Sequence, residues 1–131
     1  MSKNLFTKFF VLLLIVGLLF AVAPTKQAQA AAVVTTEAEL RDALAGTETQ
    51  IELGASFTLA ATVDVNRSVS IDGKSFTITG PGVYHGIDVT GDNVTISNLT
   101  ITGSAKSNLQ FYEATGGVVT NVVLANAGNA G

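Results

Sequence analysis

The chain has 131 residues, of which 47% are apolar and 13% charged, with 13 glycines, two prolines and no cysteine. Seven Lys and Arg against ten Asp and Glu give a net charge of −3. This composition excludes a collagen, a disulfide-stapled scaffold and a charge-rich disordered polymer.

Residues 1–30 have the organisation of a secretory signal peptide. Two lysines precede an almost uninterrupted apolar run over residues 9–23, and Ala28-Gln29-Ala30 has the small-x-small pattern that signal peptidase accepts. The alternative is a retained membrane anchor, but a run of about 15 residues is shorter than the roughly 20 that span a bilayer. The sequence therefore predicts export and cleavage after residue 30.

Cleavage there leaves 101 of the 131 residues, with four Lys and Arg against ten Asp and Glu, and hence a net charge of −6. An acidic surface argues against nucleic acid or an anionic membrane as a partner. The absence of cysteine is typical of a secreted bacterial protein rather than a small eukaryotic one. We therefore expect an extracellular protein on a bacterial cell surface, with no membrane contact after signal cleavage.

Residues 31–46 contain the only helical pattern of the mature chain and are predicted to form an N-terminal capping segment. Thr36 and Glu39 have the spacing of a capping box, and Gly46 stands where a C-terminal cap belongs. Three apolar residues are expected to share the buried face of this helix: Ala38, Leu40 and Leu44.

Residues 47–131 change to a period of two. Short apolar–polar–apolar triplets, rich in β-branched residues and separated by Gly, Asn and Asp, predict strands of about three residues. The triplets are Ile51–Leu53, Phe57–Leu59, Val63–Val65, Val69–Ile71, Phe76–Ile78, Ile87–Val89, Val94–Ile96, Leu99–Ile101 and Leu109–Phe111.

The triplets recur at a spacing of 22–25 residues. Val63–Val65 aligns with Ile87–Val89 at an offset of 24, and Ile87–Val89 aligns with Leu109–Phe111 at 22. Residues 94–101 align with residues 117–124 at an offset of 23. Three short strands per period indicate a solenoid whose coils stack to bury one continuous apolar column. An antiparallel sandwich is the alternative, but nothing in it would keep the triplets in phase.

Three features carry a family resemblance: the opening helix, the coil VTISNLTITG at Val94–Gly103 and the Asn at a short turn. By these features residues 33–131 resemble the right-handed parallel β-helix of the pectate-lyase-like superfamily. The resemblance implies an all-β solenoid with three strands per coil and an N-terminal α-helical cap. It places Asn98 and Asn121 at equivalent tight turns. Asn tolerates left-handed backbone and supplies an amide that bonds along the column. Because Asp72 and Gly73 hold this place one coil earlier, the ladder is expected to begin at Asn98.

The C-terminal end shows a coil motif over residues 121–124, followed by residues 125–131 without a visible cap. An uncapped solenoid exposes its apolar interior and its strand edges. We expect either that the chain is a truncated piece of a longer protein, or that another copy covers this end by end-to-end self-association.

Asp64, Asp88 and Gln110 occupy the outward position of three successive first strands. Two carboxylates one coil apart repel each other, and a Ca²⁺ ion bound by oxygen ligands relieves that repulsion. The resemblance adds that lyases of the superfamily bind Ca²⁺ and substrate in a groove on this face. Asp64 and Asp88 are therefore the candidate metal ligands, with Asp92 in the next turn as a further oxygen donor. The alternative is two solvated surface acids.

Two outward rows on the other faces contain Thr and Ser, as ice-binding solenoids do. The rows are expected to be Thr58, Thr77, Thr100, Val123 and Glu52, Ser70, Thr95, Val118. Thr also suits the solvent face of any strand. The interruptions by Glu and Val favour that simpler interpretation.

No catalytic constellation is present in the sequence. His85 is the only histidine, and it has no Ser or Cys partner in a known motif. Lyases of the superfamily use an Arg or Lys base among acidic metal ligands, but no matching motif surrounds Arg67, Lys74 or Lys106. We therefore carry over no catalytic residue and leave enzymatic activity open.

The expected function is that of a secreted or cell-surface β-helix protein that binds extracellular polysaccharide or acts in surface adhesion. The alternative is the N-terminal section of a polysaccharide lyase or glycoside hydrolase, with its active-site coils beyond residue 131. A third interpretation is a defective gene fragment without activity. Further coils with clustered Asp and Arg or Lys would favour the enzyme.

Overall fold

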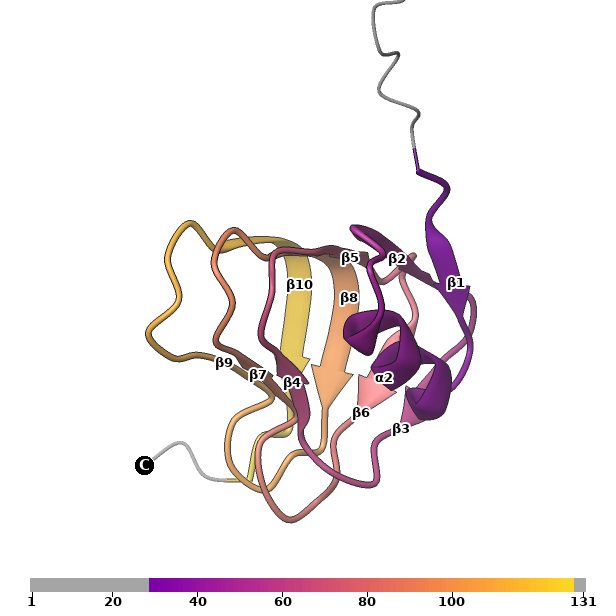
Figure 1. Ribbon diagram of the computed structural model, residues 1–131. Helices are drawn as coiled ribbons and strands as arrows, with labels where there is room; N and C mark the ends of the chain where they lie inside the picture. The colour runs from indigo at the N-terminus through magenta and orange to yellow at the C-terminus, as the bar shows by residue number, and fades with distance from the viewer. Residues whose placement is uncertain (1–28, 129–131) are drawn as a thin grey trace, which may run out of the picture.

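The computed structural model describes residues 29–128, so the predicted signal peptide lies almost entirely outside the described residues. Within them the chain forms a parallel β-solenoid of about four turns with one short helix near its N-terminal end (Figure 1). No helix in residues 29–128 is long and apolar enough to cross a membrane. The solenoid fold expected from the repeat is confirmed, and the antiparallel sandwich is excluded, because every strand pair is parallel.

The strands stack on three faces. Face 1 consists of β4 (Val63–Val65), β7 (Ile87–Val89) and β9 (Leu109–Phe111). Face 2 consists of β1 (Ala32–Val34), β2 (Gln50–Leu53), β5 (Ser70–Asp72) and the first halves of β8 (Thr95–Thr102) and β10 (Val118–Ala125). Face 3 consists of β3 (Phe57–Thr58), β6 (Thr77–Thr79) and the second halves of β8 and β10.

The strand register reproduces the sequence repeat. Val63 pairs with Ile87, and Ile87 pairs with Leu109. On face 2, Thr95 pairs with Val118. These are the offsets of 24, 22 and 23 residues at which the triplets align in the sequence. The repeat is therefore the coil itself.

The interior of the solenoid is one apolar column. Most inward residues of the central coils are buried, and Val65, Ile71, Ile78, Val89, Ile96 and Ile101 are at most 1% exposed. Burial of each such side chain stabilises the fold by about 1.5–3 kcal/mol.

Helix α2 (Glu37–Ala45) begins as the sequence predicts. The Thr36 hydroxyl accepts a hydrogen bond from the Glu39 amide at 3.2 Å. The Glu39 carboxylate closes the cap one residue earlier than a standard capping box, because it accepts from the amide and hydroxyl of Thr35 at 2.6 and 2.8 Å. At the other end, the Gly46 amide donates to the Asp42 carbonyl.

The buried face of α2 differs from the prediction at one position. It consists of Leu40, Ala43 and Leu44, whereas Ala38 is exposed. Ala38 lies two residues before Leu40, which places it about 200° around the helix, while Leu44 lies one turn after Leu40 on the same side.

Strand β1 before the helix was not predicted, because three residues without a turn signal carry too short a pattern.

Two arginines join α2 to the first coils. The Arg67 guanidinium, in the turn after β4, donates to the carbonyls of Ala43 and Leu44, both at 2.8 Å. The last turn of α2 contains no basic residue of its own, so Arg67 supplies the cation that the carbonyl end of a helix favours. Arg41 pairs with Glu37 at 2.6 Å and donates to the carbonyls of Ala61 and Thr62.

The corner between faces 2 and 3 carries a side-chain ladder. The Asn121 Nδ2 group donates to Asn98 Oδ1 at 2.9 Å, and Asn98 Nδ2 donates to Asp72 Oδ1 at 3.0 Å. Both asparagines have the expected left-handed backbone, with φ of 51° and 53°. The ladder therefore begins at Asp72, one coil earlier than predicted. Gly73 follows because a Cβ there would lie 2.6 Å from the Asn98 carbonyl oxygen.

The last coil is open on its far side. Its inward-pointing residues Val119 and Leu124 are 47% and 51% exposed, although they are in register with the buried Ile96 and Ile101. Asn121 is exposed for the same reason, while Asn98 in the coil before it is half-buried. Among the described residues, β9 and β10 pair on one side only, and Figure 1 shows them as the outermost strands of the stack.

Candidate functional site

The acidic row lies on face 1 as predicted. Asp64 pairs in register with Asp88, and Asp88 pairs with Gln110, so the three side chains leave consecutive coils at the same position. Adjacent parallel strands are about 4.8 Å apart, and this brings like charges close together. The row is graded in exposure, because Asp64 is exposed whereas Asp88 and Gln110 are half-buried.

The Asp88 carboxylate has an unsatisfied oxygen. Its Oδ1 atom is buried and has no hydrogen-bond partner among the described residues. A buried carboxylate oxygen without a donor or a cation costs free energy that a ligand would recover. Two carboxylates and one amide supply the hard oxygen ligands that Ca²⁺ prefers, but fewer than the six to eight that it takes. Water or oxygens of a second ligand would have to complete such a site.

Asp92 does not extend this row. Its Oδ1 atom accepts from the amide and the hydroxyl of Thr115, at 2.7 and 2.8 Å. These bonds, the amide bond first, hold the pKa of Asp92 below its ordinary value. Across residues 29–128 no group of three or more His, Cys, Asp and Glu side chains is placed to hold a metal. The candidate site is thus limited to the row itself.

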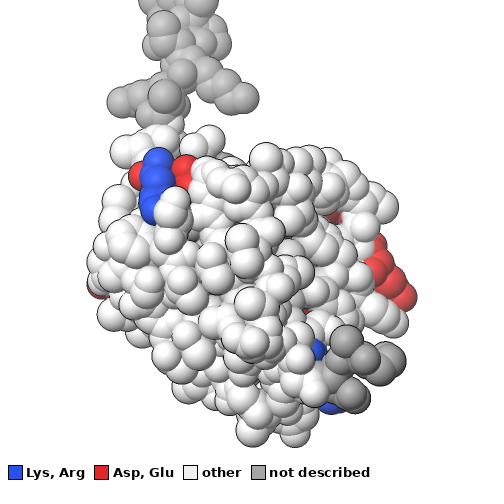
Figure 2. All heavy atoms as spheres, turned by 180° about the vertical axis from the view of Figure 1, so that it is seen from behind, with Lys and Arg blue, Asp and Glu red and all other residues white. Residues whose placement is uncertain are grey.

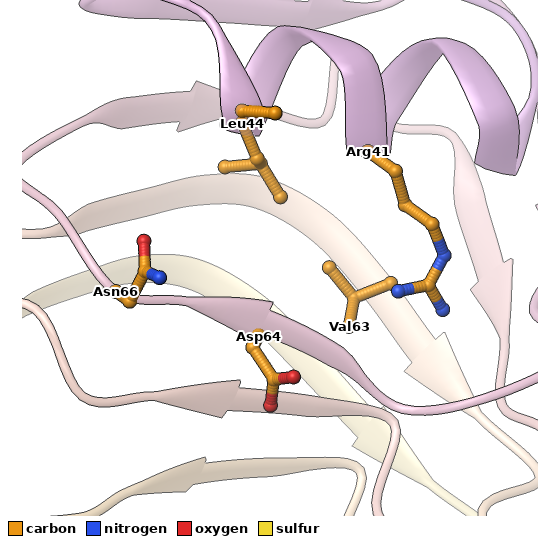
Figure 3. A pocket seen from close by; sticks show the side chains of 6 residues that line it. Arg41, Leu44, Val63, Asp64 and Asn66 are labelled. Atoms are coloured by element: carbon orange, nitrogen blue, oxygen red, sulfur yellow. The ribbon is translucent and has the colours of Figure 1, made fainter.

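A cleft of about 210 Å³ adjoins the N-terminal end of this row, between α2 and β4 (Figure 3). Arg41 reaches down from the helix, and Val63, Asp64 and Asn66 line the strand side. The Arg41 guanidinium is already bound to Glu37 and to backbone carbonyls. The cleft is also smaller than the 300–1,000 Å³ of typical ligand pockets. We therefore interpret the cleft as a gap in the packing between α2 and the first coil.

The remaining basic residues have structural partners. Lys74 pairs with Glu52 at 3.0 Å and with Asp72 at 3.1 Å. The Lys106 ammonium lies 5.9 Å from the centre of the Tyr84 ring, a cation–π contact.

His85 is a half-buried residue in the turn before β7. Its Nδ1 accepts from the Ser107 amide at 3.3 Å, and its carbonyl accepts from the Thr62 hydroxyl. The ring and backbone thus link three successive coils at one corner. The contacts are those of a structural residue.

The predicted Thr rows are only partly in register. Thr77, Thr100 and Val123 align, but Thr58 pairs with Thr79 instead. On face 2, Ser70 pairs with Gln50, whereas Glu52 pairs with Asp72. On face 3 the predicted alignment of the first coil was wrong because β3 has only two residues, so its triplet gives no unique register. The resulting surface lacks a regular Thr array.

Most of the surface seen from behind belongs to uncharged residues, and the charged side chains lie near its edges (Figure 2). No protein-family model, curated protein or solved structure matches this chain. The solenoid class rests on the parallel stacking of the strands and on the sequence repeat.

Proposed function

We propose that this protein is exported and binds an extracellular polysaccharide along face 1, serving in recognition or adhesion at a bacterial cell surface. The observation that carries the proposal is the row Asp64, Asp88, Gln110, held in register on three coils, with Asp88 Oδ1 buried and unsatisfied. Sugar hydroxyls are donors that carboxylate and amide oxygens accept from. A parallel stack of short strands presents such acceptors at even spacing, which suits a linear polymer.

A divalent cation fits the same row. Ca²⁺ would neutralise the repulsion between the two carboxylates and would leave coordination positions for water or for sugar oxygens. An acidic protein binds an anionic polymer poorly without such a bridge. Polysaccharides rich in uronic acid are accordingly expected to bind in the presence of Ca²⁺. Tyr112, which directly follows β9 and lies two residues after Gln110, is an exposed aromatic residue.

The test combines calorimetry with affinity electrophoresis. Ca²⁺ at ten times its dissociation constant should stabilise the protein by about 1.4 kcal/mol, a rise of several degrees in Tm for a domain of this size. Polygalacturonate should retard the protein when Ca²⁺ is present and not when a chelator removes it, and a neutral glucan should show whether the carboxylates of the polymer are required. Asp88→Asn should abolish both effects.

Asp42→Asn is the matched control, because Asp42 is an exposed acid on α2 with the same charge and no place in the row. This variant should keep the Ca²⁺ shift and the retardation. An absence of Ca²⁺ uptake together with unretarded migration in both polymers would refute the proposal. Equal loss of the Ca²⁺ shift and of the retardation in both variants would show a general charge effect and not a site at the row.

A further inference from the structure

Three Asn-x-Ser/Thr tripeptides lie within the described residues, and this is the acceptor sequence of N-linked glycosylation. They begin at Asn66, Asn93 and Asn98. Modification needs a side-chain amide that an enzyme can reach and a Ser or Thr hydroxyl that is not held inside a sheet, and it therefore belongs to surface loops. The fold places the three tripeptides in different environments, and these environments decide which one is open to modification.

The tripeptide at Asn98 is closed. The Asn98 amide is half-buried in the ladder, where it donates to Asp72 at 3.0 Å and accepts from Asn121 at 2.9 Å. Thr100, which supplies the hydroxyl, lies within β8 and pairs with a strand on either side. A sugar on the amide nitrogen has no room between coils about 4.8 Å apart. The folded protein therefore excludes a glycan at this position.

The tripeptide at Asn93 is exposed at its asparagine but held at its other end. Thr95 is the first residue of β8 and pairs with Ser70 and Val118 on the neighbouring strands. Asn93 has a left-handed backbone with φ of 55°, and its side-chain oxygen lies against Gly116, where a Cβ would clash. The turn of the next coil thus restricts access to this asparagine.

The tripeptide at Asn66 is open. It lies between β4 and β5, outside both strands, and Figure 3 shows Asn66 where the chain leaves β4. Asn66 and Ser68 are exposed, whereas Arg67 between them is half-buried and donates to the carbonyl end of α2. The Ser68 hydroxyl donates to the Asn93 carbonyl at 3.4 Å, which is a weak bond. The anchored arginine therefore fixes the turn while the acceptor amide and the hydroxyl remain accessible.

Asp64 distinguishes this tripeptide chemically. Bacterial oligosaccharyltransferases recognise a carboxylate two residues before the acceptor asparagine, in addition to the hydroxyl two residues after it. Asp64 supplies that carboxylate and is exposed, with the buried Val65 between it and Asn66. The other two tripeptides have a glycine and an isoleucine at the corresponding position. Local sequence and exposure therefore select the same site.

We propose that Asn66 is the acceptor for an N-linked glycan that a bacterial oligosaccharyltransferase transfers from a lipid-linked oligosaccharide. The Asn66 Nδ2 atom forms a bond to the anomeric carbon of the first sugar. The bond from that carbon to the lipid pyrophosphate breaks, and the pyrophosphate leaves with the bonding electrons, while one amide proton passes to a carboxylate of the transferase. This modification requires export, as the proposed function does, but it does not require the acidic row to bind Ca²⁺ or polysaccharide.

Glycosylation in vitro tests the acceptor site separately from export. The purified full chain is incubated with a bacterial oligosaccharyltransferase and its lipid-linked oligosaccharide, and peptide mass spectrometry measures the occupancy of each asparagine. The occupancy of Asn66 should be at least ten times that of Asn93 or Asn98. An unmodified Asn66 in a reaction that glycosylates a standard acceptor peptide would refute the proposal, as would equal occupancy of the three asparagines.

Two matched pairs of variants test recognition, with circular dichroism as the check that each variant is folded. Ser68→Ala removes the hydroxyl and should abolish modification, whereas Ser68→Thr keeps a hydroxyl and should retain the occupancy within threefold. Asp64→Asn should lower the occupancy of Asn66 at least tenfold. Asp42→Asn removes an exposed carboxylate from α2 instead and should change the occupancy less than threefold. Unchanged occupancy in the folded Asp64→Asn protein would show that the assignment to a bacterial transferase is wrong.

Production in bacterial cells that contain the transferase tests the site together with export. The recovered protein should lack residues 1–30 and carry the glycan on Asn66. A processed chain that stays unmodified in cells that glycosylate a secreted reporter would overturn the proposal. A chain that is modified in vitro but keeps residues 1–30 in cells would contradict the export in the proposed function and would support the acceptor site.

Discussion

At the residue scale, the Asn98 side chain is the middle link of the corner between faces 2 and 3. It donates to Asp72 and accepts from Asn121, and its φ of 51° places the backbone in the left-handed region. Few residue types combine an amide donor, an amide acceptor and tolerance of that backbone. Asn98 therefore meets the backbone requirement of the turn and the hydrogen-bonding requirement of the ladder at the same position.

Asn98→Ala is expected to lower the free energy of unfolding by about 1–3 kcal/mol, because it leaves two ladder partners without their bonds. Asn93→Ala is the control for backbone strain, since Asn93 has a similar φ of 55° and takes no part in the ladder. Urea denaturation of the two variants separates the effects. Equal losses would show that the ladder bonds contribute nothing beyond the turn.

The exposure of Asn121 changes what its replacement should do. A ladder partner on the open side of the last coil exchanges its hydrogen bond for one with water at little cost, so Asn121→Ala should cost less than Asn98→Ala. The ladder therefore stabilises the interior coils more than the last one.

At the element scale, α2 is held by side chains from outside the helix. Arg67 donates to two carbonyls at the C-terminal end of the helix, and the Glu37 carboxylate accepts from the Ala60 amide at 2.7 Å. The nine-residue helix is too short to be stable alone. Its docking over the N-terminal end of face 1 is what keeps Leu40 and Leu44 buried.

Arg67→Gln should destabilise the protein by about 1.5–3 kcal/mol, the range for hydrogen bonds to charged groups. Arg67→Lys should recover only part of this, because an ammonium cannot present the planar fork that reaches both carbonyls. Lys106→Gln removes a positive charge that has no contact with α2 and serves as the control. Chemical denaturation curves that coincide for Arg67→Gln and Lys106→Gln would contradict this role.

At the scale of the whole molecule, folding lowers the pKa of several carboxyl groups, among them Asp72 and Glu37, and this makes stability depend on pH. The Lys74 amide, followed by the Asn98 amide, holds the pKa of Asp72 below its ordinary value of 3.8. Burial raises the pKa of Glu37, but the Ala60 amide and Arg41 outweigh it and leave the pKa below 4.5. Both groups release protons more readily in the folded state than in the unfolded state.

A lowered carboxyl pKa gives stability that is fully present above the unfolded pKa and is lost as the pH falls through the folded one. We therefore expect that these groups leave the free energy of unfolding constant between pH 7 and 5.5 and lower it below about pH 4.5. Urea titrations at a series of pH values measure this free energy. Asp72→Asn should flatten the decline, and a wild-type curve that stays level down to pH 3 would contradict the assignment.

The sequence by itself determined the coil. Alternating triplets at a spacing of 22–25 residues are enough to predict parallel stacking and the inward set, because only residues at matching positions can fill one column. The same repeat placed Asp64 beside Asp88, since equal positions in successive coils become neighbours. Thr36 also predicted the start of α2, because its hydrogen bond to the first turn depends only on local sequence.

Only the tertiary structure decided contacts between unlike segments. The docking of Arg67 on the end of α2, the start of the ladder at Asp72 and the pairing of Thr58 with Thr79 join positions that no repeat relates. The buried oxygen of Asp88 and the exposed Val119 depend on what packs against them in space. Periodicity fixes which residues are equivalent, whereas burial and hydrogen bonding at the ends and corners depend on neighbours that the repeat does not specify.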